Sequence, residues 1–432
     1  MPRVIVIGGG LAGMSAAAAL ASAGWQTGLF ESRPFLGGRA TSYLLPGDAG
    51  PQVIDNCQHI LLRCCVNLLD FYRRAGVVGR IRFHREFHFL EPGGRRSTLR
   101  AGALPAPLHF AGSFARLRFL SLSDKLAIAR ALVALKRERT RRDDLDRISM
   151  ADWLAEKRQP AGAVERFWRP VIVSAVNDVP ERIAARYGFL VFWLGFLASA
   201  TGYEMGIPEV PLGELYARLD NVNVRLRAPV ESVAVEAGRV TGLVAGGELH
   251  TADWYVLAVP FERVPALVPA LDLDTSAFEH SSITGIHLWF DRPVTRLPHA
   301  ALLDRTIQWF FRKDDGRYLQ LVVSASRDLL AMSRQDVIAL ALKELAEFLP
   351  EVRQARLETA HVVKEARATF SAQPGLDAAR PGPRTPITNL FLAGDWTRTG
   401  WPATMEGAVR SGYLAAEAAT AAGGAPRRFL VA

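Results

Sequence analysis

The sequence predicts a mixed α/β and α+β fold, in which a parallel sheet is assembled from separated parts of the chain and a second domain is inserted between them. Two observations support this. Residues 4–7 are largely β-branched, as in a strand buried on both faces, and the Ala-rich residues 14–23 that follow have high helix propensity. Near the other end, residues 390–394 form a second apolar run before a predicted helix. The two ends of the chain are therefore expected to share one sheet.

Three glycines follow the first predicted strand at once: Gly8, Gly10 and Gly13. The first permits a tight turn, the second lets the backbone approach a pyrophosphate, and the third lets helix and strand pack closely. Leu11 and Ala12 open the helix, whose N-terminus offers N–H donors and a partial positive charge. The next predicted strand, 26–30, ends at Glu31, which is placed to accept hydrogen bonds from an adenosine ribose. This order predicts a Rossmann-like dinucleotide site.

The loop after the acid indicates which dinucleotide is bound. An NAD-binding domain would continue with further βαβ units, whereas here a second glycine pair stands between two arginines. Such a loop suits contact with an anionic pyrophosphate. The residues expected to meet the cofactor here are Ser32, Arg33, Gly37, Gly38 and Arg39.

The C-terminal motif completes the predicted site. The strand 390–394 ends in Gly394 and Asp395, and a helix is expected from about Thr404 and Met405. An Asp at a strand end suits a ribityl hydroxyl, and a helix N-terminus suits an anionic flavin oxygen. Together the two ends of the chain predict an FAD site; the alternative is that residues 389–413 form an ordinary βα unit.

The same segments carry a resemblance to known proteins. Residues 1–40 and 387–413 resemble the FAD-dependent amine oxidase and carotenoid desaturase superfamily. The segment GDWTRTGWPATMEGAVRSG resembles the plant-type phytoene desaturase branch of that superfamily. Residues 52–76 resemble the squalene-associated FAD enzymes of hopanoid pathways, the hydroxysqualene dehydroxylases. The resemblance implies that the backbone at Val230 meets adenine and that the segment with Gln58 and His59 lies beside the isoalloxazine.

Three activities remain open on these residues. Amine oxidases of the superfamily usually carry a Lys on the strand that corresponds to about 283–290, and no Lys is present there. Desaturation and dehydroxylation both need a long isoprenoid in an apolar tunnel, and they differ in the direction of hydride transfer. The resemblance favours dehydroxylation, in which hydroxysqualene and reduced FAD give squalene, water and oxidised FAD. A binding protein with a structural flavin is the remaining alternative.

Dehydroxylation requires a proton donor near the flavin. Asp55, Gln58 and His59 are the candidates, and an ordinary His pKa suits protonation of a hydroxyl near neutrality. The alternative is that His59 is hydrogen-bonded structurally and that Asp55 orients backbone. Because the sequence holds no second GxGxxG after a strand and no CxxC, we expect an external electron donor.

The pattern divides the chain into five segments. Residues 1–75, 216–260 and 385–432 are expected to form the FAD-binding domain of amine oxidase or desaturase type. Residues 76–215 are expected to form a mostly helical substrate or lid domain, and residues 261–384 a substrate domain of mixed strands and helices. The substrate-binding domain is therefore discontinuous.

Composition narrows the partners and the location. The formal net charge is +9, but no helix-turn-helix, zinc or aromatic-basic pattern indicates nucleic acid, and the three cysteines have no metal-ligand spacing. The most apolar run, 187–200, is too short to span a membrane. The apolar loop 104–120 beside the Arg-rich segment 123–147 predicts peripheral contact with an anionic membrane on its cytoplasmic face, with Phe110, Phe114 and Phe119 inserted. Other enzymes of squalene synthesis are further expected partners.

Overall fold

A five-stranded parallel sheet joins the two ends of the chain. The computed structural model describes residues 1–46 and 51–431. The strand order is β10 (Val222–Arg225), β2 (Gln26–Phe30), β1 (Arg3–Ile7), β14 (Trp254–Leu257) and β20 (Leu390–Leu392). Every neighbouring pair in this sheet is parallel. The mixed α/β fold with a Rossmann-like sheet is therefore confirmed, and its central strand is the β-branched run at the N-terminus.

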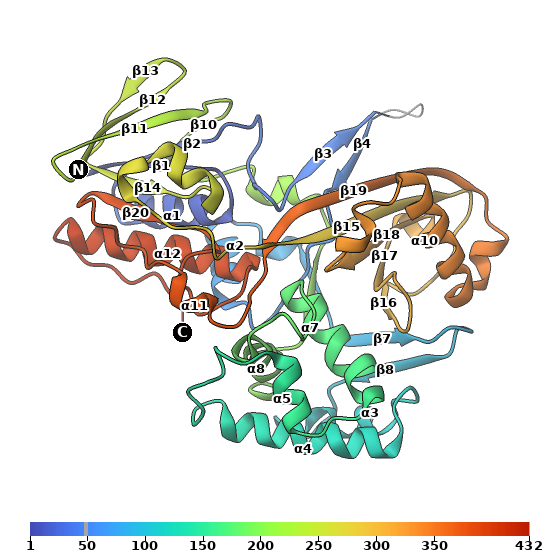
Figure 1. The fold of residues 1–432 in the computed structure, drawn as a ribbon. Helices are drawn as coiled ribbons and strands as arrows, with labels where there is room; N and C mark the ends of the chain where they lie inside the picture. Colours follow the sequence, from blue (N-terminus) through green and yellow to red (C-terminus); the bar gives the residue numbers. More distant parts are fainter. Residues whose placement is uncertain (47–50, 432) are drawn as a thin grey trace.

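Two helices from opposite ends of the chain pack together beside this sheet. Helices α1 (Leu11–Ser22) and α12 (Met405–Ala422) lie side by side (Figure 1). A Cβ atom at Gly412 would lie 2.2 Å from the carbonyl oxygen of Ala12 and equally close to Ser15. The close approach of the two helices therefore requires glycine at this position of α12.

A seven-stranded mixed sheet forms the second large layer. Its order is β19 (Leu357–Phe370), β15 (His280–Phe290), β18 (Tyr318–Ser324), β17 (Trp309–Lys313), β16 (His299–Leu302), β7 (Glu86–Leu90) and β8 (Arg96–Arg100). Helix α10 (Arg334–Phe348) packs on it (Figure 1). Smaller sheets are formed by β11 (Val230–Glu236), β12 (Arg239–Ala245) and β13 (Glu248–His250), by β3 (Ser42–Leu45) and β4 (Gln52–Asp55), and by β5 (Leu61–Leu62), β9 (Met205–Pro208) and β6 (Ile81–His84).

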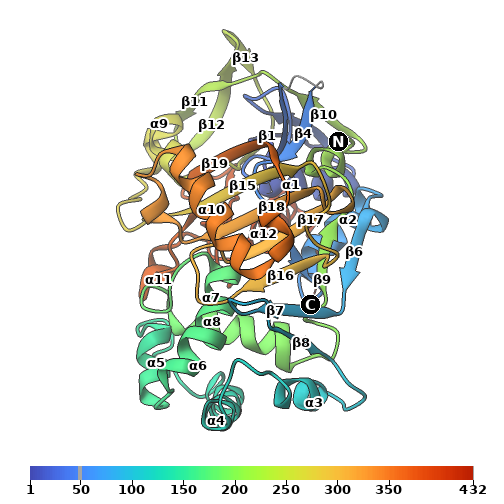
Figure 2. The same cartoon turned by 90° about the vertical axis from the view of Figure 1, so that its right-hand side faces the viewer.

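Most remaining helices gather at the end of the molecule opposite β13 (Figure 2). They are α3 (Ala111–Ala115), α4 (Leu122–Glu138), α5 (Met150–Glu156), α6 (Ala161–Ala163), α7 (Arg169–Val176) and α8 (Ala185–Phe192). The short helices α2 (Val66–Arg74), α9 (Val264–Leu267) and α11 (Leu376–Ala379) lie elsewhere. Helix α8 continues into a π-helical segment, η4 (Trp193–Leu197), so most of the apolar run 187–200 is helical.

Residues 76–215 also contribute strands, which their sequence pattern alone did not indicate. Strand β7 pairs in parallel with β16, more than 200 residues later, and with β8 it completes one edge of the seven-stranded sheet. A strand partner at such a distance leaves no signal in the local pattern, which explains the difference. The division of the chain into five segments stays a prediction.

The aromatic side chains expected at a membrane point inward instead. Phe119 is buried against Phe89 at a ring-centroid distance of 5.1 Å, and Phe114 contacts Phe167 at 5.7 Å. Phe110 packs edge-on against Tyr203 at 4.7 Å. The expectation of insertion into lipid is therefore wrong for Phe119, which is buried, while Phe110 and Phe114 are half-buried against the same interior. Among the described residues, no helix has both the length and the apolarity to cross a membrane.

Candidate cofactor and substrate cavity

One cavity of about 800 Å³ runs from the glycine turn after β1 into the helical end of the molecule. It is lined by all but two of the residues predicted for the site: Gly8, Gly10, Leu11, Ala12, Glu31, Ser32, Arg33, Gly37, Gly38, Arg39, Gln58, His59, Val230, Gly394, Asp395, Thr404 and Met405. The two others, Gly13 and Asp55, do not line it. The fold thus brings together segments separated by more than 300 residues.

The glycines act as the phosphate-binding pattern requires. Gly8 has φ +110°, and a Cβ there would lie 2.4 Å from the carbonyl oxygen of Ala258. A Cβ at Gly13 would lie 1.9 Å from the carbonyl oxygen of Gly8. Gly13 therefore serves the predicted close packing of helix and turn without facing the cavity. A Cβ at Gly10 would lie 3.9 Å from the Cα of Gly38, an ordinary contact, and Gly10 lines the cavity at the N-terminus of α1.

Glu31 is buried, and its carboxylate is held at both oxygens. Oε2 accepts a hydrogen bond from the Gly9 amide at 2.7 Å. Oε1 accepts from the Arg33 amide at 2.8 Å and from the Ser32 hydroxyl at 3.1 Å. The carboxylate therefore joins the turn after β1 to the turn after β2. Its orientation at the cavity wall suits the predicted ribose contact.

Asp395 and Arg39 form an ion pair in the cavity wall. The Arg39 guanidinium donates to Asp395 Oδ1 at 2.6 Å and to the carbonyl oxygen of Ala368 at 3.1 Å. Arg33 donates to the carbonyl oxygen of Gly38 at 3.0 Å. Two arginines and one carboxylate thus converge where the N-terminal and C-terminal motifs meet. This arrangement suits a ligand that carries both phosphates and hydroxyl groups.

The N-terminus of α12 also faces the cavity. The helix begins near Thr404, as the sequence predicted, and Thr404 caps it by accepting a hydrogen bond from the Gly407 amide at 3.0 Å. The next residue but one, Glu406, was not predicted. Its carboxylate accepts from the Leu68 amide at 2.7 Å and from the Asn67 side chain at 2.8 Å, so it caps α2 from another helix. Burial raises the pKa of Glu406.

His59, Asn56 and Glu365 form a hydrogen-bonded group on the cavity wall. His59 Nε2 lies 3.1 Å from Asn56 Oδ1, and Asn56 Nδ2 donates to Glu365 Oε1 at 3.2 Å. Asn56 Nδ2 also donates to the Arg39 carbonyl oxygen at 2.9 Å, which fixes the amide orientation. Nε2 of His59 is therefore the protonated nitrogen of the neutral ring. Glu365 was missed because it lies 309 residues from Asn56.

Burial lowers the pKa of His59 to about 4, against a smaller opposing effect of Asp55. The ring is therefore neutral at pH 7, and the geometry favours the structural alternative for this residue. A charged imidazolium donor is not supported by this environment. The catalytic assignment of His59 stays a prediction.

Asp55 faces away from this cavity. Its Oδ1 accepts from the Ser42 hydroxyl at 2.6 Å and from the Leu212 amide at 2.9 Å. It lines a second cavity of about 380 Å³, together with Lys313 and Tyr318. Asp55 therefore orients backbone, the alternative weighed for it, and its position does not support proton transfer in the larger cavity.

The far part of the cavity is apolar. Its lining there comes from the seven-stranded sheet and the helical end: Phe87, Phe89, Leu117, Phe167, Val171, Leu190, Leu194, Phe196, Trp309 and Phe311. Many of these side chains are in mutual contact, as between Phe87 and Phe196 at 6.3 Å. Aromatic residues scattered over a sequence do not reveal that they share a wall, so only the fold identifies this group.

The residues present fit FAD. The glycine turn after β1, Glu31 and the N-terminus of α12, which were predicted to meet pyrophosphate, ribose and flavin, line one cavity. Gln58 Oε1 is buried in this wall and has no hydrogen-bond partner among the residues that the structure describes. A buried acceptor of this kind calls for a ligand donor.

Comparison with known proteins agrees with this geometry. The family model described as flavin containing amine oxidoreductase matches residues 11–420. The chain is 32% identical to a hydroxysqualene dehydroxylase of Rhodopseudomonas palustris, over 97% of this chain and 99% of that protein. It is 29% identical to a probable zeta-carotene desaturase of Synechococcus elongatus, over 96% of this chain and 98% of that protein. A solved oxidoreductase structure from Methanosarcina mazei, 18% identical, superimposes with a TM-score of 0.71 over 95% of this chain and 98% of that one.

Proposed function

Because this chain belongs to the flavin-containing amine oxidoreductase family and is an FAD-dependent oxidoreductase, we propose that it removes the hydroxyl group of hydroxysqualene reductively. In the proposed reaction a carbon–oxygen bond breaks, a carbon–hydrogen bond forms, and the hydroxyl leaves as water after accepting a proton. FAD, when bound in its reduced form, supplies the hydride. An external donor must then reduce it again for the next turnover.

The apolar part of the cavity supports an isoprenoid substrate. Its aromatic and aliphatic side chains give a long hydrocarbon a dry environment, in which about 25 cal/mol per Å² of buried apolar surface favours binding. The names of relatives along the full chain, hydroxysqualene dehydroxylase and carotene desaturases, point to the same substrate class.

The observation that carries the choice of an alcohol is the polar group of His59, Asn56 and Glu365. It stands on the wall of a cavity whose lining beyond the cofactor side is mostly apolar, with Ser174, Asn177, Ser324 and Thr369 as further polar residues. A hydrocarbon such as phytoene offers no polar atom to such a group, whereas a hydroxyl both donates and accepts. The group would orient the hydroxyl-bearing carbon toward the flavin, and the surrounding apolar wall would exclude water.

Carotenoid desaturation is the second candidate. The desaturase relatives match the chain at an identity similar to that of the dehydroxylases, and the apolar wall suits both substrates. Amine oxidation is disfavoured because β15, the strand on which amine oxidases of the superfamily usually carry a Lys, has none. The residue of β15 that lines the cavity is Ile283.

Product analysis under anaerobic conditions distinguishes these reactions. Dithionite-reduced holoenzyme is mixed with hydroxysqualene, and oxidised holoenzyme is mixed separately with phytoene and with squalene. We expect squalene and oxidised flavin from the first mixture, with no product from the others. Desaturated product from phytoene, with no conversion of hydroxysqualene, would replace the proposal with desaturation.

We further propose that the enzyme docks on the cytoplasmic face of an anionic membrane through α4. Leu122, Leu126 and Val133 recur at spacings that place them on one side of this helix, and they are 74%, 55% and 50% exposed. Exposed Arg130 and Arg137 stand on the same helix, and exposed Leu104 and Leu108 precede it. Apolar insertion combined with basic charge is what an anionic lipid surface binds.

Vesicle flotation tests this docking surface. Wild type should float with vesicles that contain anionic lipid, and added salt should weaken binding. Leu122→Ser combined with Leu126→Ser should reduce binding at least tenfold, since each leucine contributes about 1.5–3 kcal/mol when fully buried. Leu249→Ser is the matched control, because Leu249 is 68% exposed on β13 at the opposite end (Figure 2). Equal loss in both variants would contradict the assignment to α4.

A further inference from the structure

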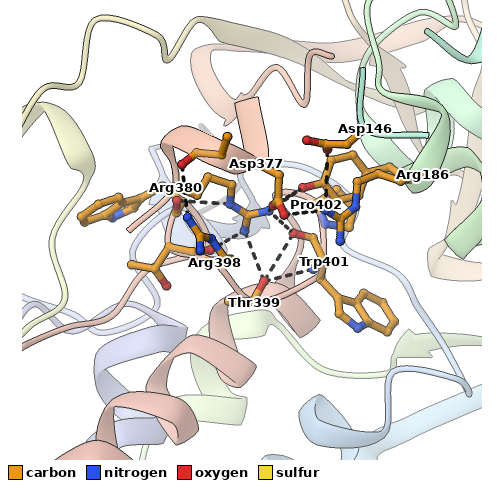
Figure 3. A network of polar contacts seen from close by, with 12 residues as sticks. Asp146, Arg186, Asp377, Arg380, Arg398, Thr399, Trp401 and Pro402 are labelled. Atoms are coloured by element: carbon orange, nitrogen blue, oxygen red, sulfur yellow. Dashed lines mark hydrogen bonds and ion pairs between the residues drawn. The ribbon is translucent and has the colours of Figure 1, made fainter. Parts of the chain in front are cut away.

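A buried guanidinium stands behind the cofactor-binding loop at residues 395–401. Arg380 follows α11 and is fully buried. It does not line the cavity, yet it is the centre of the polar network in Figure 3. Its hydrogen bonds divide into two sets, one with the loop 395–401 and one with Tyr187 and Asp377.

The first set consists of acceptors within the loop. Arg380 Nη2 donates to the carbonyl oxygen of Asp395 at 2.8 Å, to that of Thr397, and to Thr399 Oγ1 at 3.2 Å. Nη1 donates to the carbonyl oxygen of Trp401 at 2.8 Å, and Nε donates to that of Trp396 at 3.3 Å. One side chain thus binds four main-chain carbonyls of a loop with no regular secondary structure.

The second set lies on the side of the helical domain. Arg380 Nη1 donates to the Tyr187 hydroxyl at 2.6 Å and to Asp377 Oδ1 at 3.0 Å. The Tyr187 hydroxyl in turn donates to the same Asp377 oxygen at 2.9 Å. Tyr187 belongs to α8, whose Leu190 and Val191 line the apolar part of the cavity. Arg186 pairs with Asp377 and approaches Asp146 at 3.6 Å, so two guanidinium groups face two carboxylates (Figure 3).

The loop that Arg380 holds presents Asp395, Trp396 and Trp401 to the cavity. Asp395 was predicted to bind the ribityl chain, and it pairs with Arg39 at 2.6 Å. Rotation of the 395–401 backbone would move this carboxylate relative to the N-terminal half of the site. A planar guanidinium with five N–H groups can bind several carbonyls at fixed angles, which the single ammonium of a lysine cannot reproduce.

We propose that Arg380 is a positioning residue for the flavin. By fixing the main chain of residues 395–401 it sets the place of Asp395 and of the two tryptophans at the cofactor, and through Tyr187 it ties that loop to the helix that lines the apolar end. The inference rests on the FAD site alone and holds for either direction of hydride transfer. A failure of the proposed substrate would therefore leave this inference unaffected, and the reverse also holds.

The test compares three variants of the full chain. Arg380→Lys keeps the charge but loses the fork of donors, and Thr399→Val removes one acceptor of the network, which makes it the milder change. Arg398→Gln is the control, because Arg398 is exposed and, among the described residues, its side chain hydrogen-bonds only to the carbonyl oxygen of Ala378. For each we measure the FAD dissociation constant, the visible circular dichroism of the FAD-saturated protein, and the melting temperature.

We expect FAD to bind at least tenfold more weakly in Arg380→Lys and several-fold more weakly in Thr399→Val. The visible dichroism of the saturated flavin should change in both variants and stay unchanged in Arg398→Gln. A structural role alone would lower the melting temperature and leave this spectrum unchanged. If Thr399→Val folds and its saturated flavin has the wild-type spectrum and affinity, the proposal is overturned, even where Arg380→Lys does not fold.

Discussion

At the scale of single residues, the carboxylates decide how the cavity is used. Glu31, Asp395 and Glu365 all line it, but each has a different set of partners. Glu31 accepts from two backbone amides, Asp395 pairs with Arg39, and Glu365 accepts from Asn56. The first two belong to motifs that the sequence displays. Glu365 could be identified only from the structure, in which β19 lies beside the segment that holds Asn56.

Glu31→Ala should weaken FAD binding by about 1.5–3 kcal/mol, because charge-assisted hydrogen bonds to the ribose are lost. Glu31→Gln keeps the shape and one acceptor, so it should lose less. Titration of the apoprotein with FAD, followed by quenching of flavin fluorescence, gives both constants. Wild-type affinity in Glu31→Ala would contradict the ribose contact.

Asp395→Ala should impair FAD binding or flavin orientation more than it impairs folding. The substitution removes the ribityl acceptor and leaves Arg39 without its carboxylate. Flavin content, the visible spectrum and the melting temperature are compared with wild type. Normal flavin content with normal turnover would mean that the C-terminal motif does not contact the cofactor.

Glu365→Leu should reduce affinity for hydroxysqualene about tenfold and leave affinity for squalene nearly unchanged. The reason is that a hydrogen bond between a carboxylate and the hydroxyl of hydroxysqualene contributes about 1.5–3 kcal/mol, whereas squalene has no hydroxyl and forms no such bond. Binding of both ligands to the oxidised holoenzyme is measured by flavin difference spectra. A parallel loss for both ligands would assign Glu365 to packing instead of hydroxyl recognition.

At the scale of helices and strands, contact between α1 and α12 joins the two halves of the FAD site. Intrinsic propensity predicts that Gly412→Ala stabilises α12 by about 1 kcal/mol. The structure predicts the opposite sign, because the new methyl would lie 2.2 Å from a backbone oxygen that cannot move independently. We expect a loss of about 1–3 kcal/mol and weaker retention of FAD, checked by thermal unfolding. A stabilised variant would show that the helices separate without cost.

At the scale of the whole molecule, buried histidines couple folding to pH. Burial lowers the pKa of eight of the nine histidines: His59, His84, His88, His109, His280, His287, His299 and His361. The pKa of His59 falls to about 4, and those of His287 and His299 to about 3. The folded state therefore prefers neutral rings, whereas the unfolded chain binds protons below its ordinary pKa of about 6.5.

The resulting stability is fully present above pH 6.5 and is lost as the pH falls toward the folded pKa values. For His59, His287 and His299, protonation lowers the free energy of unfolding by up to about 1.4 kcal/mol per pH unit between pH 6.5 and the folded pKa of each ring. We expect the melting temperature to be flat from pH 7 to 8 and to fall steeply from pH 6 to 4. A melting temperature that does not change between pH 7 and 5 would mean that these rings gain access to water and titrate normally.

The sequence by itself determined the nucleotide-binding half of this protein. The strand before Gly8, the acid at Glu31 and the helix start near Thr404 were all predicted, and each lies where the pattern placed it. These signals are local, because a tight turn, a phosphate-binding helix N-terminus and a helix cap each depend on a few consecutive residues. Features that depend on consecutive residues can therefore be recognised from the sequence alone.

Only the tertiary structure decided which distant residues meet. It placed Glu365 beside Asn56, assembled the loop carbonyls around Arg380, and turned Phe119 inward while Leu122 remained exposed. Each of these outcomes depends on which surface packs against another part of the chain, and neighbouring residues do not specify that partner. The cofactor site was therefore predictable from short motifs, whereas the apolar cavity wall, the group of His59, Asn56 and Glu365, and the exposed side of α4 were fixed by long-range packing.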